Sequence, residues 1–483
     1  MSKVADPSDD VQEMRTACAK GRALMGGTTA MREAGVTYLP KFGAESDTAY
    51  KARLNSSWLF NGYRKTVKDM SGRVFGKPVE LADAPNDLVT WCENVDLQGR
   101  DLSTFAREVF EDGLSGAGIS YVMVDAPARD AVVSKADAQA QNLRPFLVHL
   151  SVDEVLGWRS ETVNNVTRIT QFRIMECVTE PDPEDEFADK EIEQVRVLDL
   201  IESRVQVRLF RKAKQANGVE DWVLWGEPTF VDMPEITVAA FYANRDGFFE
   251  GEPPLDDLAD VNIAHWQSQS DQRHILHYAR VPILFGSGVE ENDITIGGSN
   301  IVTAGADAKL AYVEHSGSAI ESGRQDLKDL EFQMEALGLQ LLTPRQSAQS
   351  ATGEALDAAK ETSQLAMMAD ALRDCLEQCM IWMCQYGGLG DQSPTVQIND
   401  DFGVQPFGPQ EASVLLQMVT AGELSRQTFI EELVRRGFIR SDLTAEEEYQ
   451  RILADQAGGV QEFAANAANA GGMPTTVGGM PAA

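Results

Sequence analysis

PLDDLADVNIAHWQSQSDQRHILHYA (254–279) is followed along the chain by VPILFG (281–286), AKLAYVE (308–314) and ESGRQDLKDLEFQMEALGLQLL (321–342). The first stretch opens on two prolines, at positions 253 and 254, and proline suits the first turn of a helix. At the standard rise, a helix of this length would extend roughly 39 Å. The two middle stretches have the composition of short strands. The sequence therefore predicts a helix, a small β module and a returning helix.

The middle of the first helix, QSQSDQRH (267–274), has no apolar face. A helix that is polar all round does not pack into the core of a monomer. We therefore expect this segment to be exposed or packed against copies of itself. In that arrangement Gln267, Gln269 and Asp271 would pair with the adjacent copy or face a channel.

The returning helix carries a single apolar seam with spacings of three and four residues: Leu327, Leu330, Met334, Leu337 and Leu341. Acidic residues occupy the opposite side: Asp326, Asp329, Glu331 and Glu335. A single seam on a short helix favours packing against a neighbour. We therefore expect Leu327, Leu330, Met334 and Leu337 to contribute to oligomerisation.

Between the two helices, residues 280–320 hold the two short strands, an acidic turn and a glycine pair. The turn and the pair comprise Glu290, Glu291, Asp293, Gly297 and Gly298. Two short strands are too few to be stable by themselves. We expect this module to be ordered mostly by its neighbours.

A polar break, TPRQSAQSAT (343–352), follows the returning helix and contains one cation and no acid. A long helix is predicted next, over 353–386, with the seam Leu365, Met368, Leu372, Cys375 and Cys379. A strand (395–400) and three short helices within 409–456 come after it. The tail from Gly458 is rich in Ala, Gly, Pro and Asn, a composition typical of disorder.

The first half of the chain divides into a helical part and a β-rich part. Residues 1–110 are predicted to be mainly helical, with one helix over 49–75 and another that Asp101 or Ser103 could cap. A strand, ISYVMV (119–124), follows a glycine-rich turn. Residues 145–245 alternate and are rich in β-branched and aromatic side chains, which predicts a mostly antiparallel sheet with a solvated acidic loop at Glu180 to Glu186. The fold class is α+β.

The charge balance excludes some classes of protein. The 483 residues include 42 Lys and Arg against 75 Asp and Glu, a formal charge of −33. A protein that coats DNA needs cations for phosphate contacts, so a repressor or nuclease is disfavoured. A channel through which DNA slides without sticking is compatible with this charge. Six cysteines are too sparse for a disulfide framework, and no apolar run is long enough to span a membrane.

The motifs of common enzymes are missing from the sequence. There is no Walker A or GxSxG sequence, and GLSGAG (113–118) precedes a strand, so it is interpreted as a helix-to-strand turn rather than a nucleotide loop. His274 with His277 is interpreted as a polar pair rather than a metal site. Asp256 with Asp257 is interpreted as a solvated helix start. We expect no catalytic residue, no cofactor and no metal.

Two further patterns have competing interpretations. AGELSRQTFIEELVRRG (421–437) mimics a helix-turn-helix, but Glu431 and Glu432 nearly cancel Arg435 and Arg436, which favours a packing hairpin over a DNA reader. The cysteines of the long helix lie on its apolar seam, which favours core packing over metal or redox roles.

The order of these parts resembles that of the portal proteins of tailed bacteriophages. EGEPPLDDLADVNIAHWQSQSDQRHILHYARVPILFGSG (250–288) and FYANRDGF (241–248) are similar to stretches of one portal branch whose function is uncharacterised. The resemblance covers about residues 30–457. It implies a wing (1–253 with 353–407), stem helices (254–279 and 321–342), a clip (280–320), a tunnel loop (343–352), a crown (408–457) and a disordered tail (458–483).

The resemblance also implies a function and partners. Such proteins form rings of about twelve copies at one capsid vertex, closed by a heterologous interface. Double-stranded DNA passes through without sequence-specific binding, during packaging and ejection. The clip residues would contact the large terminase and the head–tail adaptor, and other surfaces the major capsid and scaffold proteins. The ring would assemble in the bacterial host cytoplasm and reside in the virion, without a membrane.

The tunnel loop would face the DNA through Arg345, Gln346, Ser347, Gln349 and Ser350. A ring of Arg345 side chains could grip DNA, whereas the alternative is a solvent-exposed loop with Arg345 bonded to a neighbouring wing. Two other functions remain open. The protein could be another virion structural protein, such as a minor head protein or adaptor, or a cytosolic enzyme.

Overall fold

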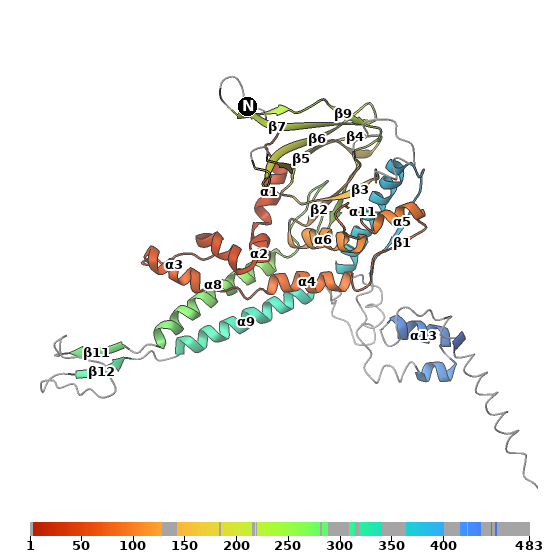
Figure 1. Ribbon diagram of the computed structural model, residues 1–483. Helices are drawn as coiled ribbons and strands as arrows, with labels where there is room; N and C mark the ends of the chain where they lie inside the picture. The colour runs from red at the N-terminus through yellow and green to blue at the C-terminus, as the bar shows by residue number, and fades with distance from the viewer. Residues whose placement is uncertain are drawn as a thin grey trace, which may run out of the picture. The chain divides into compact units, whose positions relative to one another are not determined.

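The computed structural model describes residues 3–127, 143–182, 185–214, 218, 220–280, 283–287, 309–313, 318–340, 364–399, 416–422, 424–435, 446 and 450–451. The chain divides into two compact units, Met1–Phe402 and Gly403–Ala483. The first unit combines helices with antiparallel sheets and is an α+β body, as the sequence predicted (Figure 1). In the second unit, α13 covers Arg426–Arg435 within the helix-turn-helix-like segment.

The N-terminal part of the first unit is helical. It comprises α1 (Asp9–Ala17), α2 (Ala19–Ala34), the short η1 (Gly35–Thr37), α3 (Asp47–Ser56), α4 (Gly62–Val74), α5 (Asn86–Cys92) and α6 (Leu102–Ser115). Asp101 is the cap of α6, because its side chain accepts a hydrogen bond from Thr104 N. The cap confirms one of the two residues proposed from the sequence.

The single helix predicted over 49–75 is wrong, because the chain breaks between α3 and α4. Ser57 is extended (φ −73°, ψ 144°), and Asn61 caps α4 by accepting from Arg64 N. Trp58 and Phe60, which helical spacing placed in one apolar series, lie in the break with partly exposed side chains. A side chain that caps a new helix competes with continuation of the old one.

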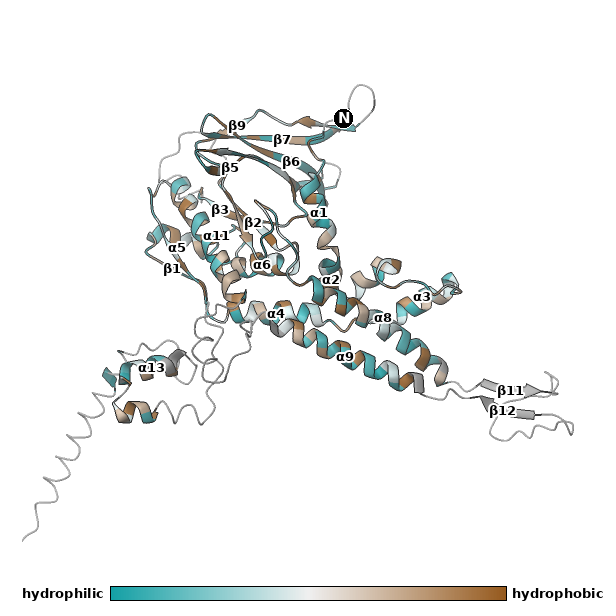
Figure 2. Ribbon diagram, turned by 180° about the vertical axis from the view of Figure 1, so that it is seen from behind, coloured by the Kyte–Doolittle hydropathy of each residue, from teal (hydrophilic) through white to brown (hydrophobic). Residues whose placement is uncertain are grey.

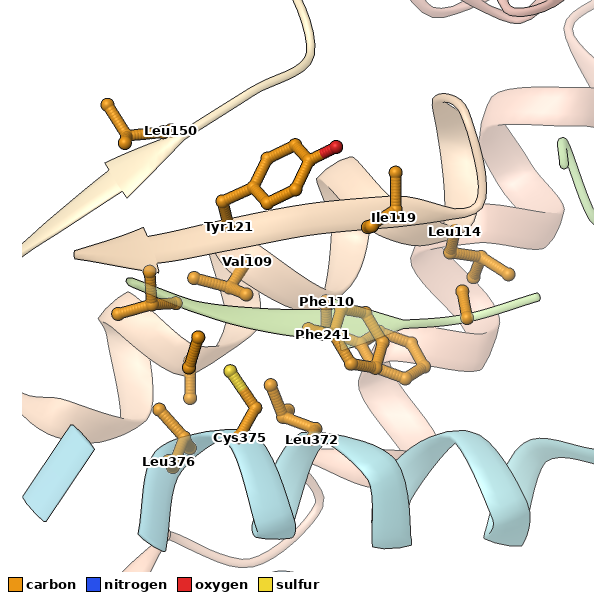
Figure 3. Packing of buried hydrophobic residues seen from close by; sticks show 14 of the residues in the cluster. Val109, Phe110, Leu114, Ile119, Tyr121, Leu150, Phe241, Leu372, Cys375 and Leu376 are labelled. Carbon is orange, nitrogen blue, oxygen red and sulfur yellow. The ribbon is translucent and has the colours of Figure 1, made fainter. Parts of the chain in front are cut away.

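A three-stranded antiparallel sheet forms the centre of the core, in the order β10 (Val238–Tyr242), β2 (Ile119–Asp125), β3 (Phe146–Leu150). Helices α6 and α11 (Gln364–Gly387) pack on it. Figure 3 shows Val109 and Phe110 of α6, Phe241 of β10 and Leu372, Cys375 and Leu376 of α11 among the buried side chains. The predicted seam of the long helix, including Cys375 and Cys379, is buried, which confirms the core interpretation of these cysteines.

A larger antiparallel sheet has the order β4 (Val155–Val163), β5 (Val166–Pro181), β6 (Asp189–Ile201), β7 (Arg204–Lys214), β8 (Glu220–Leu224), with β9 (Thr229–Val231) paired to β7. The antiparallel strands predicted over 145–245 are therefore confirmed, but they form two sheets, because β3 and β10 pair with β2 instead of joining the larger sheet. The acidic segment 180–186 belongs to the end of β5 and the connection to β6. The turn predicted at 113–118 also joins α6 to β2, as expected.

The two helices predicted over 254–279 and 321–342 form a helical hairpin with a pair of strands at its tip. Helix α8 covers Asp256–Ala279, strands β11 (Ile283–Ser287) and β12 (Lys309–Val313) pair antiparallel, and α9 covers Ser318–Gln340. Helices α8 and α9 lie side by side and project from the body with the β pair at their far end (Figures 1 and 2). After α11, β13 (Thr395–Gln397) pairs with β1 (Glu80–Ala82).

Candidate assembly surface on the helical stem

The polar residues of α8 are fixed inside the chain itself. Asn262 is fully buried: its Oδ1 accepts from Tyr63 N at 2.9 Å, and its Nδ2 donates to Phe60 O at 2.8 Å. These two bonds satisfy the start of α4 and fix it against α8. A buried amide with both its ends bonded is a stable arrangement, because no polar atom is left without a partner.

A buried ion pair lies where α3 meets α8. Arg53 NH2 is 2.8 Å from Glu45 Oε2, and the two side chains are only 2% and 4% exposed. Hydrogen bonding from Arg53 lowers the pKa of the Glu45 carboxyl, so this acid stays charged in the fold. Ser57 Oγ donates to Ser270 Oγ of α8 at 2.9 Å, which continues the polar contact between the two elements.

Further polar residues in the middle of α8 bond within the chain as well. Gln267 Nε2 donates to Tyr38 O at 3.0 Å, and Gln272 Nε2 donates to Ile320 O at 2.8 Å. Ser268 Oγ donates to Asp326 of α9. Ser270 and Gln272 are buried. The expectation that this segment cannot pack within a monomer is therefore wrong, because α3 and α9 supply partners for its polar atoms.

The other two polar positions proposed for oligomerisation are less enclosed. Asp271 lies 3.8 Å from Arg53 NH1 and its side chain is half exposed; burial raises the pKa of this carboxyl. Gln269 is partly buried. Their predicted pairing with an adjacent copy stays a prediction.

The apolar seam of α9 faces its own chain. Met334 is buried, and its Sδ lies 2.8 Å from where a Cβ on Gly62 of α4 would stand. Leu327, Leu330 and Leu337 are half-buried, and Leu337 packs against the main core. Met334 therefore packs against α4 of its own chain, and Leu337 packs against the core, so these two residues are not free for a neighbouring copy. The predicted contribution of Leu327 and Leu330 to oligomerisation stays a prediction.

The opposite face of α9 exposes an aromatic side chain instead. Phe332 is 72% exposed and lies between the acidic positions Asp329 and Glu335, which are exposed too. Sequence reasoning assigned that side to charge alone and missed the phenyl ring. The signal was present in the sequence, as a large aromatic two residues from the seam position Met334. An exposed ring on a projecting helix is a candidate contact for another molecule.

The remaining site residues proposed from the sequence lie outside the described residues. They are the clip positions Glu290, Glu291, Asp293, Gly297 and Gly298, and the tunnel-loop positions Arg345, Gln346, Ser347, Gln349 and Ser350. Their roles stay predictions. The described strands β11 and β12 pair at the far end of the α8–α9 hairpin.

One cluster combines the residue types of a hydrolase, next to a cavity of about 260 Å³ that Arg22, Asp112 and Asp153 help to line. Ser120 Oγ is 2.8 Å from His149 Nε2, and Asp112 Oδ2 is 3.2 Å from the same nitrogen. In a catalytic triad the acid holds Nδ1 so that Nε2 can take the serine proton. Here both groups share one nitrogen and Ser120 is fully buried, so the cluster lacks the geometry of nucleophilic catalysis.

Among the residues that the structure describes, no group of three or more His, Cys, Asp or Glu could hold a metal ion. Within these ranges, no helix is both long and apolar enough to cross a membrane.

The chain matches one family model and is similar to a number of solved chains, two of which are described below. The family described as "Domain of unknown function (DUF4055)" matches residues 254–387, which run from the start of α8 to the end of α11. No curated protein matches the chain. The chain is similar to solved chains described as "Neck of empty GTA particle computed with C6 symmetry" and "Neck of native GTA particle computed with C12 symmetry". Each is 11% identical, with 78% of this chain and 89% of that chain covered and TM-scores of 0.37 and 0.38. Likeness at this level does not establish a common fold or function.

Proposed function

We propose that the chain is a structural protein of a phage-like particle, and within that class the portal. The observation that supports this is the projecting α8–α9 hairpin with a β pair at its tip, joined to an α+β body. This order of parts is the one in which the sequence resembles portal proteins. In that role the protein would form a ring through which DNA passes, with the tip at residues 280–320 meeting the terminase and later the adaptor.

Ring formation would use the outer face of α9. Interfaces between protein copies concentrate their binding energy in a few aromatic and arginine side chains at the centre of the contact. Among the large apolar side chains of α9 whose burial the structure describes, that of Phe332 is the most exposed. Asn262, Gln267 and Gln272 of α8 bond within the chain, whereas Gln269, Asp271 and the outer face of α9 would be available to a neighbour.

The test is sedimentation velocity with negative-stain imaging of the purified full chain. We expect a closed ring for the wild type and smaller species for Phe332→Ser. Phe187→Ser is the matched control, because Phe187 is 90% exposed in the connection between β5 and β6, away from α8 and α9. A wild-type protein that stays monomeric or dimeric would refute the ring. A ring that is unchanged in Phe332→Ser would exclude this residue from the interface.

A second candidate is another virion structural protein, such as an adaptor or a minor head protein. The α+β body with its projecting hairpin fits any component that must join two partners at different ends. Binding to the large terminase separates the two proposals, because the portal docks the packaging motor and the other components do not. Deletion of residues 290–298 should then abolish terminase binding and leave the ring assembled. Terminase binding that survives this deletion would contradict the clip assignment.

We also propose that the protein is not an enzyme. The shared nitrogen of His149 in the Ser120, His149 and Asp112 cluster supports this, because the serine lacks a separately oriented base. A terminase-free preparation should hydrolyse neither ATP nor activated esters. Hydrolysis that disappears in Ser120→Ala would overturn the proposal.

A further inference from the structure

Helix α4 and the residues directly after it carry a net positive charge, although the chain as a whole is strongly acidic. Residues 62–77, GYRKTVKDMSGRVFGK, contain five cations and one acid, a balance of +4 in a chain whose formal charge is −33. The cations are Arg64, Lys65, Lys68, Arg73 and Lys77, and all five are exposed. Arg107 of α6 is exposed nearby, with its guanidinium 5.7 Å from the centre of the Phe75 ring at the end of α4. These six residues are called the α4 cationic face.

The helix itself separates these cations from the core. Val67, Met70 and Val74 recur at helical spacing and are buried, so the charged positions lie on the exposed sides of α4. Lys65 pairs with Asp69 and Lys68 with Glu111, yet the two lysine side chains remain 74% and 57% exposed. Ion pairs this exposed contribute little stability. Their cations can therefore exchange their partners for another anion.

Both described ends of the segment that contains the predicted tunnel loop lie beside α4. At the end of α9, a Cβ on Gly338 would stand 3.0 Å from Thr66 Oγ1 of α4, and α9 ends at Gln340. The long helix α11 begins at Gln364, and its first turns lie next to α4 in both views (Figures 1 and 2). The chain therefore leaves α4 at residue 340 and returns to it at residue 364.

The composition of the face distinguishes between two anionic partners. A contact between protein copies needs an apolar centre that excludes water. Residues 62–77 expose no large apolar side chain. Phosphate contacts need only cations at suitable spacing, and Lys65 to Arg73 extends roughly 12 Å along the helix, enough to reach several phosphates. Charge complementarity without an apolar centre therefore favours a nucleic-acid backbone.

We propose that the α4 cationic face binds the phosphate backbone of double-stranded DNA, without regard to sequence. It would act beside the predicted tunnel loop and supply most of the cations there, where Arg345 was the one cation expected. The placement along a DNA channel rests on the proposed portal function. The binding chemistry of the face itself does not require a ring.

The experiment compares two triple variants of the full chain. Lys65→Gln, Lys68→Gln and Arg73→Gln remove three cations from the face. The control, Arg168→Gln, Lys190→Gln and Arg204→Gln, removes three exposed cations from the larger sheet. Each triple variant takes the formal charge from −33 to −36, so the long-range field of the molecule changes equally. The probe is a short fluorescent DNA duplex of random sequence, titrated by anisotropy between about 50 and about 200 mM salt.

We expect the α4 variant to bind the duplex at least about tenfold more weakly than the wild type, with a salt slope smaller by about two to three. The control should retain wild-type binding. An equal loss in both variants would show that net charge alone decides binding and would overturn the proposal. Unchanged binding in the α4 variant, or a wild type that binds no duplex even at low salt, would overturn it too.

Sedimentation of the same samples separates the remaining possibilities. If the α4 variant loses the ring but keeps DNA binding, the face contacts a second copy and the proposal is wrong. If the wild type forms no ring but the α4 face still binds DNA, the portal function fails and the phosphate-binding face stands.

Discussion

Gly118, at the turn from α6 into β2, is a residue that the fold cannot replace. Its φ is +76°, and a Cβ there would stand 2.0 Å from Glu252 O. Its carbonyl accepts hydrogen bonds from Ala243 N and Asn244 N at 2.9 and 3.0 Å. The glycine therefore brings the segment after β10 against the start of β2, at the centre of the body.

Gly118→Ala should lower the free energy of unfolding by at least about 2 kcal/mol, because the left-handed backbone and the contact with Glu252 both oppose a methyl group. Gly72→Ala in α4 is the control, since nothing lies within 4 Å of its Cβ position. Alanine there should instead stabilise the helix by about 0.5–1 kcal/mol. Urea unfolding monitored by circular dichroism measures the free energy of unfolding of both variants. A neutral Gly118→Ala would show that the turn relaxes at little cost.

We expect the stability of the α8–α9 hairpin to depend on pH through His265 of α8. The side chain is 1% exposed and lies against Phe60, with the ring centroids 5.2 Å apart and the planes tilted by 40°. Glu331 Oε1 is 3.5 Å from its Nε2. Burial lowers the pKa of the imidazole, while Glu331 and Asp326 of α9 oppose the shift only in part. The folded protein therefore takes up a proton on this ring less readily than the unfolded chain does.

The free energy of unfolding should consequently fall as the pH drops below the ordinary imidazole value of about 6.5, because the unfolded chain then binds more protons. The loss levels off below the lowered pKa of the folded state. His265→Phe should remove this dependence and leave that of the carboxylates. Unfolding midpoints of the wild type and of His265→Phe, measured in steps from pH 8 to pH 5, test this expectation. An identical pH profile in His265→Phe would contradict the assignment.

At the scale of the element, α9 has two faces with different roles. Met334 fills the contact with α4, whereas Phe332 points away from the chain's own packing. The α8–α9 hairpin is thus stabilised within one copy by the seam and by the bonds of Gln272 and Ser268. Its outer face is left for contacts with other molecules.

Met334→Asp should unfold α9 or separate it from α4, because burial of an unpaired carboxylate costs several kcal/mol. Phe332→Asp should leave the thermal midpoint of the protomer nearly unchanged, since that site is already in water. Differential scanning calorimetry of both variants, under conditions where the wild type is dissociated, measures the contrast. Similar midpoints for the two variants would show that α9 is not packed as described.

At the scale of the whole molecule, charge opposes assembly. About twelve copies at −33 each would carry roughly −400 charges, and their mutual repulsion extends over a Debye length of about 10 Å at 0.1 M salt. An apolar contact such as that proposed for Phe332 is not weakened by salt, whereas the repulsion is.

Raising the salt concentration from about 50 to about 300 mM should therefore increase the fraction of assembled ring in sedimentation velocity. Binding of DNA to the α4 cationic face should weaken over the same range, because phosphate contacts release counterions. The two responses have opposite signs. A ring that dissociates as salt rises would mean that ion pairs, rather than apolar contacts, hold the copies together.

The α+β class, the bounds of α8 and α9 within a few residues, the antiparallel strands over 145–245 and the buried cysteines of α11 were all predictable from the sequence, but the division of those strands between two sheets was not. Each depends on a local pattern: a proline before a helix, a period of two along strands, or an apolar seam at helical spacing. The clip and tunnel-loop roles remain predictions, because they fall outside the described residues.

Only the tertiary structure decided what the stem helices contact. The sequence did not reveal that the polar middle of α8 bonds within one copy, because its partners are distant in sequence. Tyr38, Arg53 and Ser57 lie more than two hundred residues earlier. Likewise, Met334 of the α9 seam packs against α4, whereas Phe332 on the opposite face is exposed. A periodic pattern specifies that a face is buried or polar. The residues that pack against that face come from distant parts of the sequence, so the spacing of residues along one helix does not identify them.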